Sequence, residues 1–285
     1  MDFYFSALIL GLCLSLMALG IFISMKIFRI PDITTDGSYT LGAVVAALCL
    51  TKGLPVAATI PIVLLAGAIA GAVTGLVHTR LRIDALLSGI LVMTALYSVN
   101  LSLLGRSNVP LLNVAHVFNL VQGGITAELV VSLVFSAVAL FLIGYVLKTD
   151  FGIAMRATGN STTMSRAAGV HVDRMKIIGL AIANALTALS GFLVCQYQSF
   201  TDINMGIGIV IIGLGSVLIG DAVIAWFRIS NLWLQLMLVV AGSIIFQMVL
   251  AFVLSIGVDP NLLKLATAVF VLLIVALPVI KRRAA

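Results

Sequence analysis

The chain has 285 residues, of which 62% are hydrophobic and only 9% are charged. A soluble globular domain carries about 25% charged residues, so this composition excludes a water-soluble fold. A transmembrane helix needs about 20 apolar residues, and about nine such helices with their connections account for the whole length. We therefore predict an all-α, polytopic membrane protein with a single membrane domain over residues 1–285.

Long apolar runs along the sequence predict about nine transmembrane helices, with about eight or ten as alternatives. The second run is short and begins with glycine, and the seventh run is also short. The second and seventh helices are therefore candidates for broken or re-entrant segments. The glycines Gly67, Gly71 and Gly75 in the third run recur every four residues, which favours close packing against another helix. The predicted helices span residues 3–25, 37–51, 54–79, 84–104, 127–147, 176–198, 206–226, 231–254 and 262–280.

The basic residues divide unevenly between the two sides that these crossings define. Three of them, Lys52, Arg106 and Lys264, fall on one side and 13 on the other. Cytoplasmic loops carry the excess of lysine and arginine, so the N-terminus is predicted outside and the C-terminus in the cytoplasm. The formal charge of +6 is explained by this sidedness, and no nucleic acid partner is expected. The 13 are Lys26, Arg29, Arg80, Arg82, Lys148, Arg156, Arg166, Arg174, Lys176, Arg228, Lys281, Arg282 and Arg283.

Residues that could form an active site or a metal site are sparse. Cys13, Cys49 and Cys195 lie in apolar runs without metal-ligand spacing, and they are expected to be small apolar core residues. The sequence contains no H-E-x-x-H, G-x-S-x-G or phosphate-binding G-x-x-x-x-G-K-[ST] motif. We therefore expect no catalytic residue, no metal and no cofactor in this chain.

Two short segments, residues 35–44 and 201–210, share the pattern T-D-x4-[LI]-G-x-V at an offset of 166. The predicted topology places the first at the cytoplasmic face and the second at the outer face, as in an inverted repeat with short half-helices. Chance similarity is the alternative. Asp36 and Asp202 are each expected to cap the helix that follows them.

The longest cytoplasmic segment, residues 148–176, carries its own helix signals. Thr149 or Asp150 can cap a first short helix, and Ser161 or Thr162 can cap a second one that ends at Gly169. Methionine, arginine and small residues suit contact with a partner protein, whereas a loop on the anionic lipid surface is the alternative. The predicted contact residues are Met155, Arg156, Gly159, Asn160, Met164, Arg166, Ala167, Ala168 and Gly169.

Polar side chains in the middle of apolar helices indicate where a substrate path runs, because an unpaired polar group in lipid costs several kcal/mol. Hydrogen bonding between helices is the alternative role for each of them. The wider set includes Ser98, Ser190 and Gln247, and the favoured path residues are Ser88, Thr94, Tyr97, Asn100, Asn184 and Thr187. The outer loop, residues 105–126, offers polar contacts outside the membrane through Arg106, Asn108, His116, Asn119 and Gln122.

The run from Phe151-Gly152 through Arg156-Ala157 and Gly159-Asn160 to Ala167-Ala168-Gly169-Val170 resembles the coupling-helix loop of permease subunits in ABC importers. The superfamily that it resembles includes branched-chain amino-acid, ribose and nucleoside permeases. Residues 31–38, 86–100 and 108–112 look most like the tryptophan/tyrosine-type permeases, and the glycine-rich residues 213–221 fit the late half-helix region of the superfamily.

This resemblance implies a permease subunit of an ATP-driven importer in the bacterial plasma (inner) membrane. The implied partners are a second permease copy in a homodimer, cytoplasmic ATPase subunits on the coupling loops, an extracytoplasmic substrate-binding protein, and membrane lipid. ATP and Mg would be bound by the partner ATPase. The implied solute is an amino acid such as tryptophan or tyrosine. The alternative is an ion-coupled secondary transporter, which would place Asp, Glu or His mid-membrane as a relay.

Overall fold

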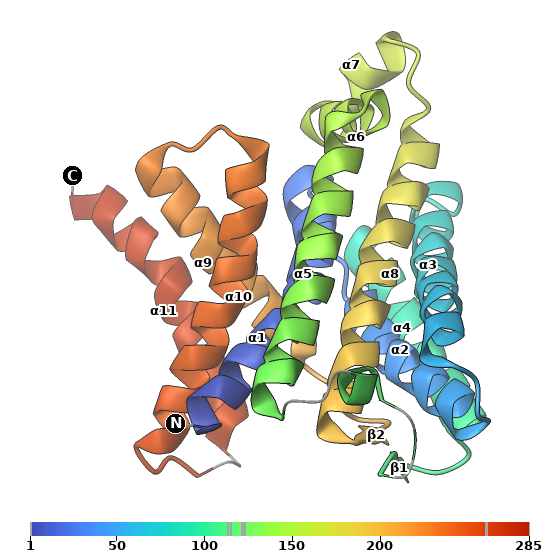
Figure 1. The fold of residues 1–285 in the computed structure, drawn as a ribbon. Coiled ribbons are helices and arrows are strands. Elements are labelled where there is room, and N and C mark those ends of the chain that lie inside the picture. The colour runs from blue at the N-terminus through green and yellow to red at the C-terminus, as the bar shows by residue number, and fades with distance from the viewer. Residues whose placement is uncertain (1, 113, 115, 121–123, 260–261, 285) are drawn as a thin grey trace.

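The computed structural model describes residues 2–112, 114, 116–120, 124–259 and 262–284. Helices dominate these residues, and the two short strands form one small sheet (Figure 1). The first helix, α1 (Asp2–Ile21), continues into a π-helical segment, η1 (Phe22–Ile27). The other elements are α2 (Thr34–Thr51), α3 (Val56–Arg80), α4 (Ala85–Leu104), β1 (Asn108–Pro110), η2 (Val117–Leu120), α5 (Ile125–Lys148), α6 (Asp150–Asn160), α7 (Thr162–Ala167), α8 (Val172–Gln198), β2 (Phe200–Asp202), α9 (Ile209–Phe227), α10 (Leu232–Ser255) and α11 (Leu263–Ala284).

The all-α, polytopic class is confirmed. Among the described residues, 7 helices are long and apolar enough to cross a membrane: α1 with η1, α3, α4, α5, α8, α9 and α10. The second and ninth predicted helices correspond to α2 and α11. They are not among the 7 found in the described residues, so the predicted number of nine is not established.

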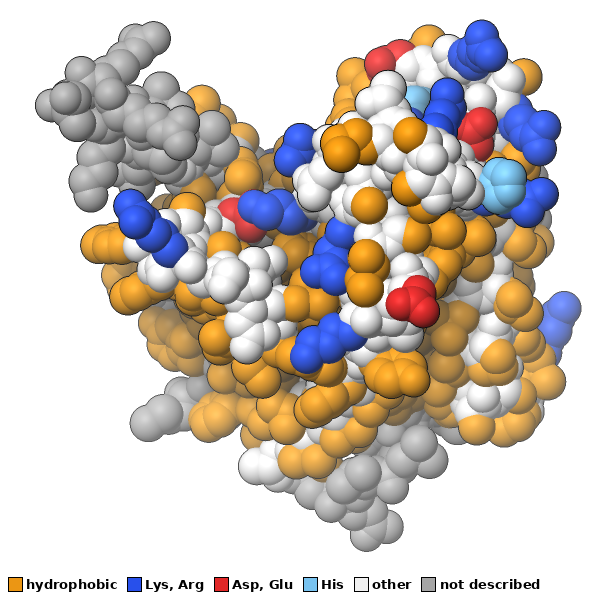
Figure 2. All heavy atoms as spheres, turned by 90° about the horizontal axis from the view of Figure 1, so that it is seen from above, with side chains coloured by type: hydrophobic (Ala, Val, Ile, Leu, Met, Phe, Trp, Pro, Cys, Tyr) orange, Lys and Arg blue, Asp and Glu red, His pale blue; other side chains and the backbone are white. Residues whose placement is uncertain are grey.

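The ends of the helices agree with the predicted sidedness. Figure 1 places the N-terminus at one end of the bundle and the C-terminus at the other, where α6 and α7 also lie. Figure 2 looks onto the end that carries α6 and α7 and shows many lysine and arginine side chains gathered there. Since basic residues concentrate on the cytoplasmic side, we call this the cytoplasmic end.

Helix α8 is the centre of the packing. It contacts α1, α2 and α3 along its length, and nearly all of its side chains from Gly179 to Gln196 are buried. The glycines of α3 allow the close approach that their spacing predicts: a Cβ on Gly71 would overlap the carbonyl of Leu180, and one on Gly75 would lie 2.7 Å from Cα of Ile177. Backbone contact of this kind lets two helices pack without bulky side chains between them.

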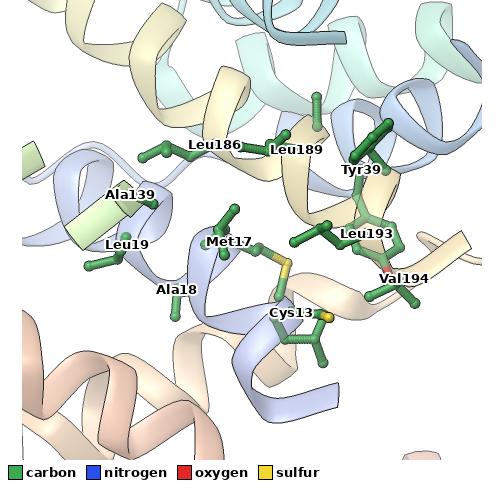
Figure 3. Packing of buried hydrophobic residues seen from close by; sticks show 14 of the residues in the cluster. Cys13, Met17, Ala18, Leu19, Tyr39, Ala139, Leu186, Leu189, Leu193 and Val194 are labelled. Atoms are coloured by element: carbon green, nitrogen blue, oxygen red, sulfur yellow. The ribbon is translucent and has the colours of Figure 1, made fainter. Parts of the chain in front are cut away.

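The core forms where α1 and α2 meet α8. Figure 3 shows Met17 of α1 beside Leu186, Leu189 and Leu193 of α8, with Tyr39 of α2 close by. The cysteines Cys13, Cys49 and Cys195 are free and buried, as expected for small apolar core residues.

The helix contacts reveal an inverted repeat. In chain order, α1, α2, α3 and α4 correspond to α8, α9, α10 and α11, whose first residues lie 170, 175, 176 and 178 positions later. The contacts match: α1 packs on α10 as α8 packs on α3, and α2 contacts α3 and α4 as α9 contacts α10 and α11. In Figure 1, α1 runs towards the cytoplasmic end and α8 runs away from it. The two halves therefore share one packing scheme in opposite orientations, which is the inverted repeat that was one of the two alternatives from the sequence.

Candidate translocation site and coupling surface

Asn184 marks the middle of the membrane domain. It lies 12 residues after the first residue of α8 and 14 before the last. At about 1.5 Å per residue these intervals correspond to about 18 and 21 Å along the helix axis. Groups that bond to the side chain of Asn184 therefore lie near the mid-depth of the membrane.

A buried polar cluster surrounds Asn184 at this depth. Its Nδ2 donates to Oδ2 of Asp32 at 2.7 Å, and its Oδ1 accepts from the hydroxyl of Ser38 at 2.7 Å. Oδ1 of Asp32 accepts from the backbone N–H of Thr34 at 2.9 Å, and the Thr34 hydroxyl bonds to that of Thr74 at 2.8 Å. The chain thus returns from the cytoplasmic end of η1 to mid-depth before α2 begins. We define Asp32, Thr34, Ser38, Thr74 and Asn184 as the polar cluster.

Asp36 joins the N-termini of two helices from different halves of the protein. It lies in the first turn of α2. Its Oδ2 accepts from the backbone N–H of Gly208 and its Oδ1 from that of Val210, both at 2.8 Å. Free N–H groups and the positive end of the helix dipole both favour a carboxylate at the start of α9. The half-helices α2 and α9 therefore meet at their N-terminal ends.

The expectation that each aspartate of the repeat caps its own helix is wrong. Asp36 caps α9, which belongs to the other half. Asp202 lies in β2 and accepts a local bond from the N–H of Asn204 at 2.7 Å, and α9 begins only at Ile209. Asp36 lies in the first turn of α2, whereas Asp202 ends β2 before α9 begins, so the shared pattern does not mark equivalent positions in the two halves.

A small cavity of about 20 Å³ lies beside this junction, between α2, α4 and residues 203–207. Tyr97 and Asn100 of α4 line it together with Thr40 of α2. Asn100 is 1% exposed; its Nδ2 donates to the carbonyl of Gly37 at 3.3 Å, and its buried Oδ1 accepts no hydrogen bond from the described residues. The volume suffices for about one water molecule, so the site is nearly closed in this conformation.

The structure gathers only some of the predicted path residues. Asn184 lies in the polar cluster, and Tyr97 and Asn100 line the cavity. The hydroxyls of Ser88, Thr94 and Thr187 bond to carbonyls of Asp84, Ile90 and Ala183, one turn earlier in the chain. That of Ser190 reaches the carbonyl of Cys13 in α1, which is the interhelical role considered for it. Asp32 and Asp36 were missed, because the predicted topology placed them in or next to a cytoplasmic loop.

The two short helices predicted in residues 148–176 are present as α6 and α7. Thr149 caps α6 by accepting from the N–H of Gly152 at 3.4 Å, and Ser161 caps α7 by accepting from that of Met164 at 3.3 Å. Gly169 has a φ of +81°, and the N–H of Val170 donates to the carbonyl of Ser165 at 2.9 Å. Gly169 therefore ends α7 as a C′ glycine, as its position predicts.

The predicted coupling residues divide into exposed and packed groups. Met155 is 1% exposed, and a Cβ on Gly159 would overlap the carbonyl of Ile27, so these two residues pack α6 inside the protein. The expectation that they offer exposed contacts to a partner is wrong in this conformation. Arg156 is half-buried, and exposed Asn160 accepts from Arg29 at 3.3 Å. The fully exposed group, here called the coupling surface, comprises Met164, Arg166, Ala167, Ala168 and Gly169.

The outer loop is tied to the segment after α8 by the small sheet. Strands β1 and β2 pair antiparallel, with Asn108 opposite Asp202. Arg106 and Asn108 are exposed, whereas His116 is buried. The side chain of Asn119 and all of Gln122 lie outside the described residues. Within the described part of the chain, no group of three or more His, Cys, Asp or Glu side chains has a metal-binding arrangement.

Comparison with known proteins identifies the family. The model of the family described as "Branched-chain amino acid transport system / permease component" matches residues 3–278. The chain belongs to this family. It is accordingly the permease component of an ABC transporter and a multi-pass protein of the bacterial inner membrane. Membership also implies association with ATPase and binding-protein components.

Individual relatives support this assignment. The chain is 40% identical over 267 residues to a tyrosine transport system permease protein of Clostridioides difficile (strain R20291), covering 93% of this chain and 88% of the relative. It is 23% identical over 192 residues to the ribose import permease protein RbsC of Haemophilus influenzae, covering 66% and 59% of the two chains. A solved metal-chelate type ABC transporter in an inward-facing conformation shares the fold, with a TM-score of 0.54 and 15% identity over 98% of this chain and 85% of that one.

Replacing Asp36 with asparagine tests the junction between α2 and α9. Asparagine has only one acceptor oxygen. One buried N–H of α9 therefore loses its acceptor, and the other bonds to a neutral amide oxygen in place of a charged carboxylate oxygen. We expect Asp36→Asn to lower the free energy of unfolding by about 2–3 kcal/mol. The matched control, Asp202→Asn, keeps its single local bond and should change stability by less than about 0.5 kcal/mol. Thermal unfolding of the purified proteins in detergent measures both stability changes. Equal effects of the two substitutions would contradict the role of Asp36 in joining α2 to α9.

Proposed function

We propose that this chain imports an aromatic amino acid, with tyrosine first and tryptophan second, as a homodimeric permease driven by a separate ATPase. The observation that carries the proposal is the junction of α2 and α9 at mid-depth beside a cavity with an aromatic and an amide side chain. The 40% identical relative named as a tyrosine transport permease supports the choice of substrate.

The chemistry of the cavity suits an aromatic amino acid. Tyr97 is 44% exposed, and its ring can stack against an aromatic side chain. Oδ1 of Asn100 has no donor among the described residues and can accept a hydrogen bond from the ammonium group of the substrate. Neither group is charged, which suits brief passage of a zwitterion, while tight binding is left to the extracytoplasmic binding protein.

The face of α4 supports the second copy. Within the chain α4 packs against α2 and α3, and its opposite face exposes Thr94, Tyr97 and Ser98. Polar side chains on a lipid-facing helix are unfavourable, whereas they are suitable on a face that lines an aqueous path. We place the path between this face and the same face of a second copy, so that opening of the cavity requires movement between the two subunits.

The route from the ATPase to the path begins at the coupling surface. Helix α6 packs on η1 through Gly159, whose Cα approaches the carbonyl of Ile27. The segment after η1 carries Asp32 of the polar cluster, which leads into α2, and Asp36 connects α2 to α9. A displacement of α6 and α7 by the ATPase can thus reach both half-helices and shift them between two discrete packings.

In this proposal the chain is not an enzyme, and ATP and Mg bind to the partner ATPase. Ion coupling has one observation in its favour, because Asp32 and Asp36 are carboxylates at mid-depth. All four of their oxygens accept hydrogen bonds within the protein, so we assign them a structural role. Uptake that is sensitive to vanadate and resistant to ionophores supports the ATP-driven importer, and the opposite sensitivity supports an ion-coupled carrier.

Tyr97 tests the position of the path. Tyr97→Ala should reduce ATP-driven tyrosine uptake about tenfold, because a stacking contact of about 1.4 kcal/mol is lost. The control is Tyr145→Ala, which removes a 70% exposed tyrosine from α5. Uptake of labelled tyrosine is measured in proteoliposomes that contain the permease, its ATPase and its binding protein. If the two variants transport equally well, the path does not pass Tyr97.

Gly169 tests the coupling surface. Gly169→Trp adds a bulky side chain where the ATPase is proposed to bind, and we expect at least a tenfold loss of ATP-driven uptake. Gly53→Trp is a matched control, since Gly53 has a φ of +79°, close to the +81° of Gly169, and both positions face open space. Backbone strain is therefore similar in the two variants, but Gly53 lies at the outer end. Equal uptake by the two variants would remove α7 from the coupling route.

A further inference from the structure

A cleft of about 360 Å³ lies at the cytoplasmic end, between η1 and α6 on one side and the turn from α9 to α10 on the other. Figure 2 looks onto this end, which is hollowed between two raised parts and has basic side chains along the hollow. Lys26 and Arg156 line the cleft together with Asn160 and Gln235. The cleft is separate from the mid-depth cavity and from the exposed coupling surface on α7.

The charges in the cleft leave one cation without a counter-ion. Lys26 forms an ion pair with Asp221, with 2.8 Å between Nζ and Oδ2. No ion pair is found for Arg156 in the described part of the chain, and its buried Nε donates no hydrogen bond there. A buried guanidinium donor without an acceptor is unfavourable, so the cleft is suited to an anion that reaches Arg156.

The end of α10 adds to this preference. This 24-residue helix begins at Leu232, which lines the cleft. The side chain of Asn231 accepts from the N–H of Trp233, and the remaining N–H groups of the first turn, with the positive end of the helix dipole, favour a negative charge at this end of the helix. Arg156 and the α10 N-terminus therefore face the same space from opposite walls.

The other lining residues indicate what kind of anion the cleft accepts. Phe22, Ile27 and Leu232 make part of the wall apolar. Trp226 and Phe227, next to the cleft along the chain, are 79% and 71% exposed and stacked on each other. Exposed aromatic residues at a helix end mark the level of the lipid headgroups. The cleft thus lies where a phospholipid can place its phosphate inside and its glycerol and acyl carbons against the apolar wall.

We propose that this cleft binds the phosphate of an anionic phospholipid such as phosphatidylglycerol. Arg156 donates to the phosphate oxygens from α6, and the first turn of α10 faces them from the second half of the protein. Such a lipid bridges α6 to α10 and stabilises one relative position of the two halves. The proposal is independent of which solute the transporter carries.

The test uses the two tryptophans, Trp226 and Trp233, which lie on either side of the turn between α9 and α10. Trp233 packs on α5, with Lys148 Nζ 5.3 Å from its ring centroid, so Trp233→Phe is used and the 79% exposed Trp226 remains as the reporter. The full-length protein is reconstituted into vesicles of phosphatidylcholine with increasing brominated phosphatidylglycerol, or with brominated phosphatidylcholine, and quenching of its fluorescence is measured. We expect brominated phosphatidylglycerol to enter the site about fivefold more favourably than brominated phosphatidylcholine. This is the preference for anionic lipid that one basic residue near a membrane surface gives.

Arg156→Gln should abolish this preference, and Arg80→Gln, at the exposed cytoplasmic end of α3, should retain it. Ser230→Glu keeps Arg156 and adds a negative charge to the exposed opposite wall, so it should abolish the preference even if Arg156→Gln folds poorly. Equal quenching by the two lipids in the parent protein, or equal losses in Arg156→Gln and Arg80→Gln, would overturn the proposal. A preference for phosphatidylglycerol that inorganic phosphate removes would indicate a free-phosphate site and would also overturn the proposal. An Arg156→Gln variant that loses ATPase binding but keeps the lipid preference would overturn it as well.

Discussion

The packing of the two halves depends on one carboxylate at the centre of the membrane domain. Asp36 belongs to α2 but accepts both of its hydrogen bonds from the start of α9, at 2.8 Å each. In lipid, the free N–H groups at a helix start need an acceptor from the protein, since no bulk water is available. A half-helix such as α9 can therefore begin inside the membrane domain because the opposite half supplies that acceptor. This requirement fixes the ends of α2 and α9 beside each other.

The remaining buried polar groups follow from the same constraint. Because α2 also begins at mid-depth, the preceding segment needs partners there, and Asp32, Asn184 and Ser38 satisfy one another. Glycine contacts bring α3 and α8 close enough to enclose this cluster. The cavity at Tyr97 and Asn100 lies where the junction meets the exposed face of α4. Closing or opening it therefore requires the half-helices to move relative to α4 or to a second copy.

Local signals in the sequence predicted much of this structure. The caps at Thr149 and Ser161, the C′ glycine Gly169 and the glycine stripe of α3 depend on near neighbours or on helix periodicity, and these are confirmed. The apolar runs correctly predicted the all-α membrane class, but their number of nine is not established. The role of Asp36 depends on a contact between residues 172 and 174 positions apart, which spacing does not reveal. Met155 was misassigned for a related reason, because a methionine on a short helix suits a partner surface and a core equally well.

The central claim is that Asp36 holds α2 and α9 together while the transporter works. The direct measurement is the distance between spin labels on Lys52, just after α2, and Arg228, just after α9, by double electron–electron resonance. The native cysteines are replaced by alanine, and the permease is assembled with its ATPase. Labels are placed on only one of the two copies, so that the distance within a subunit is measured. The account predicts that this distance is narrow, that it stays the same without nucleotide and with ATP and vanadate, and that it broadens in Asp36→Asn. A wild-type distance that changes between the two nucleotide states would contradict it.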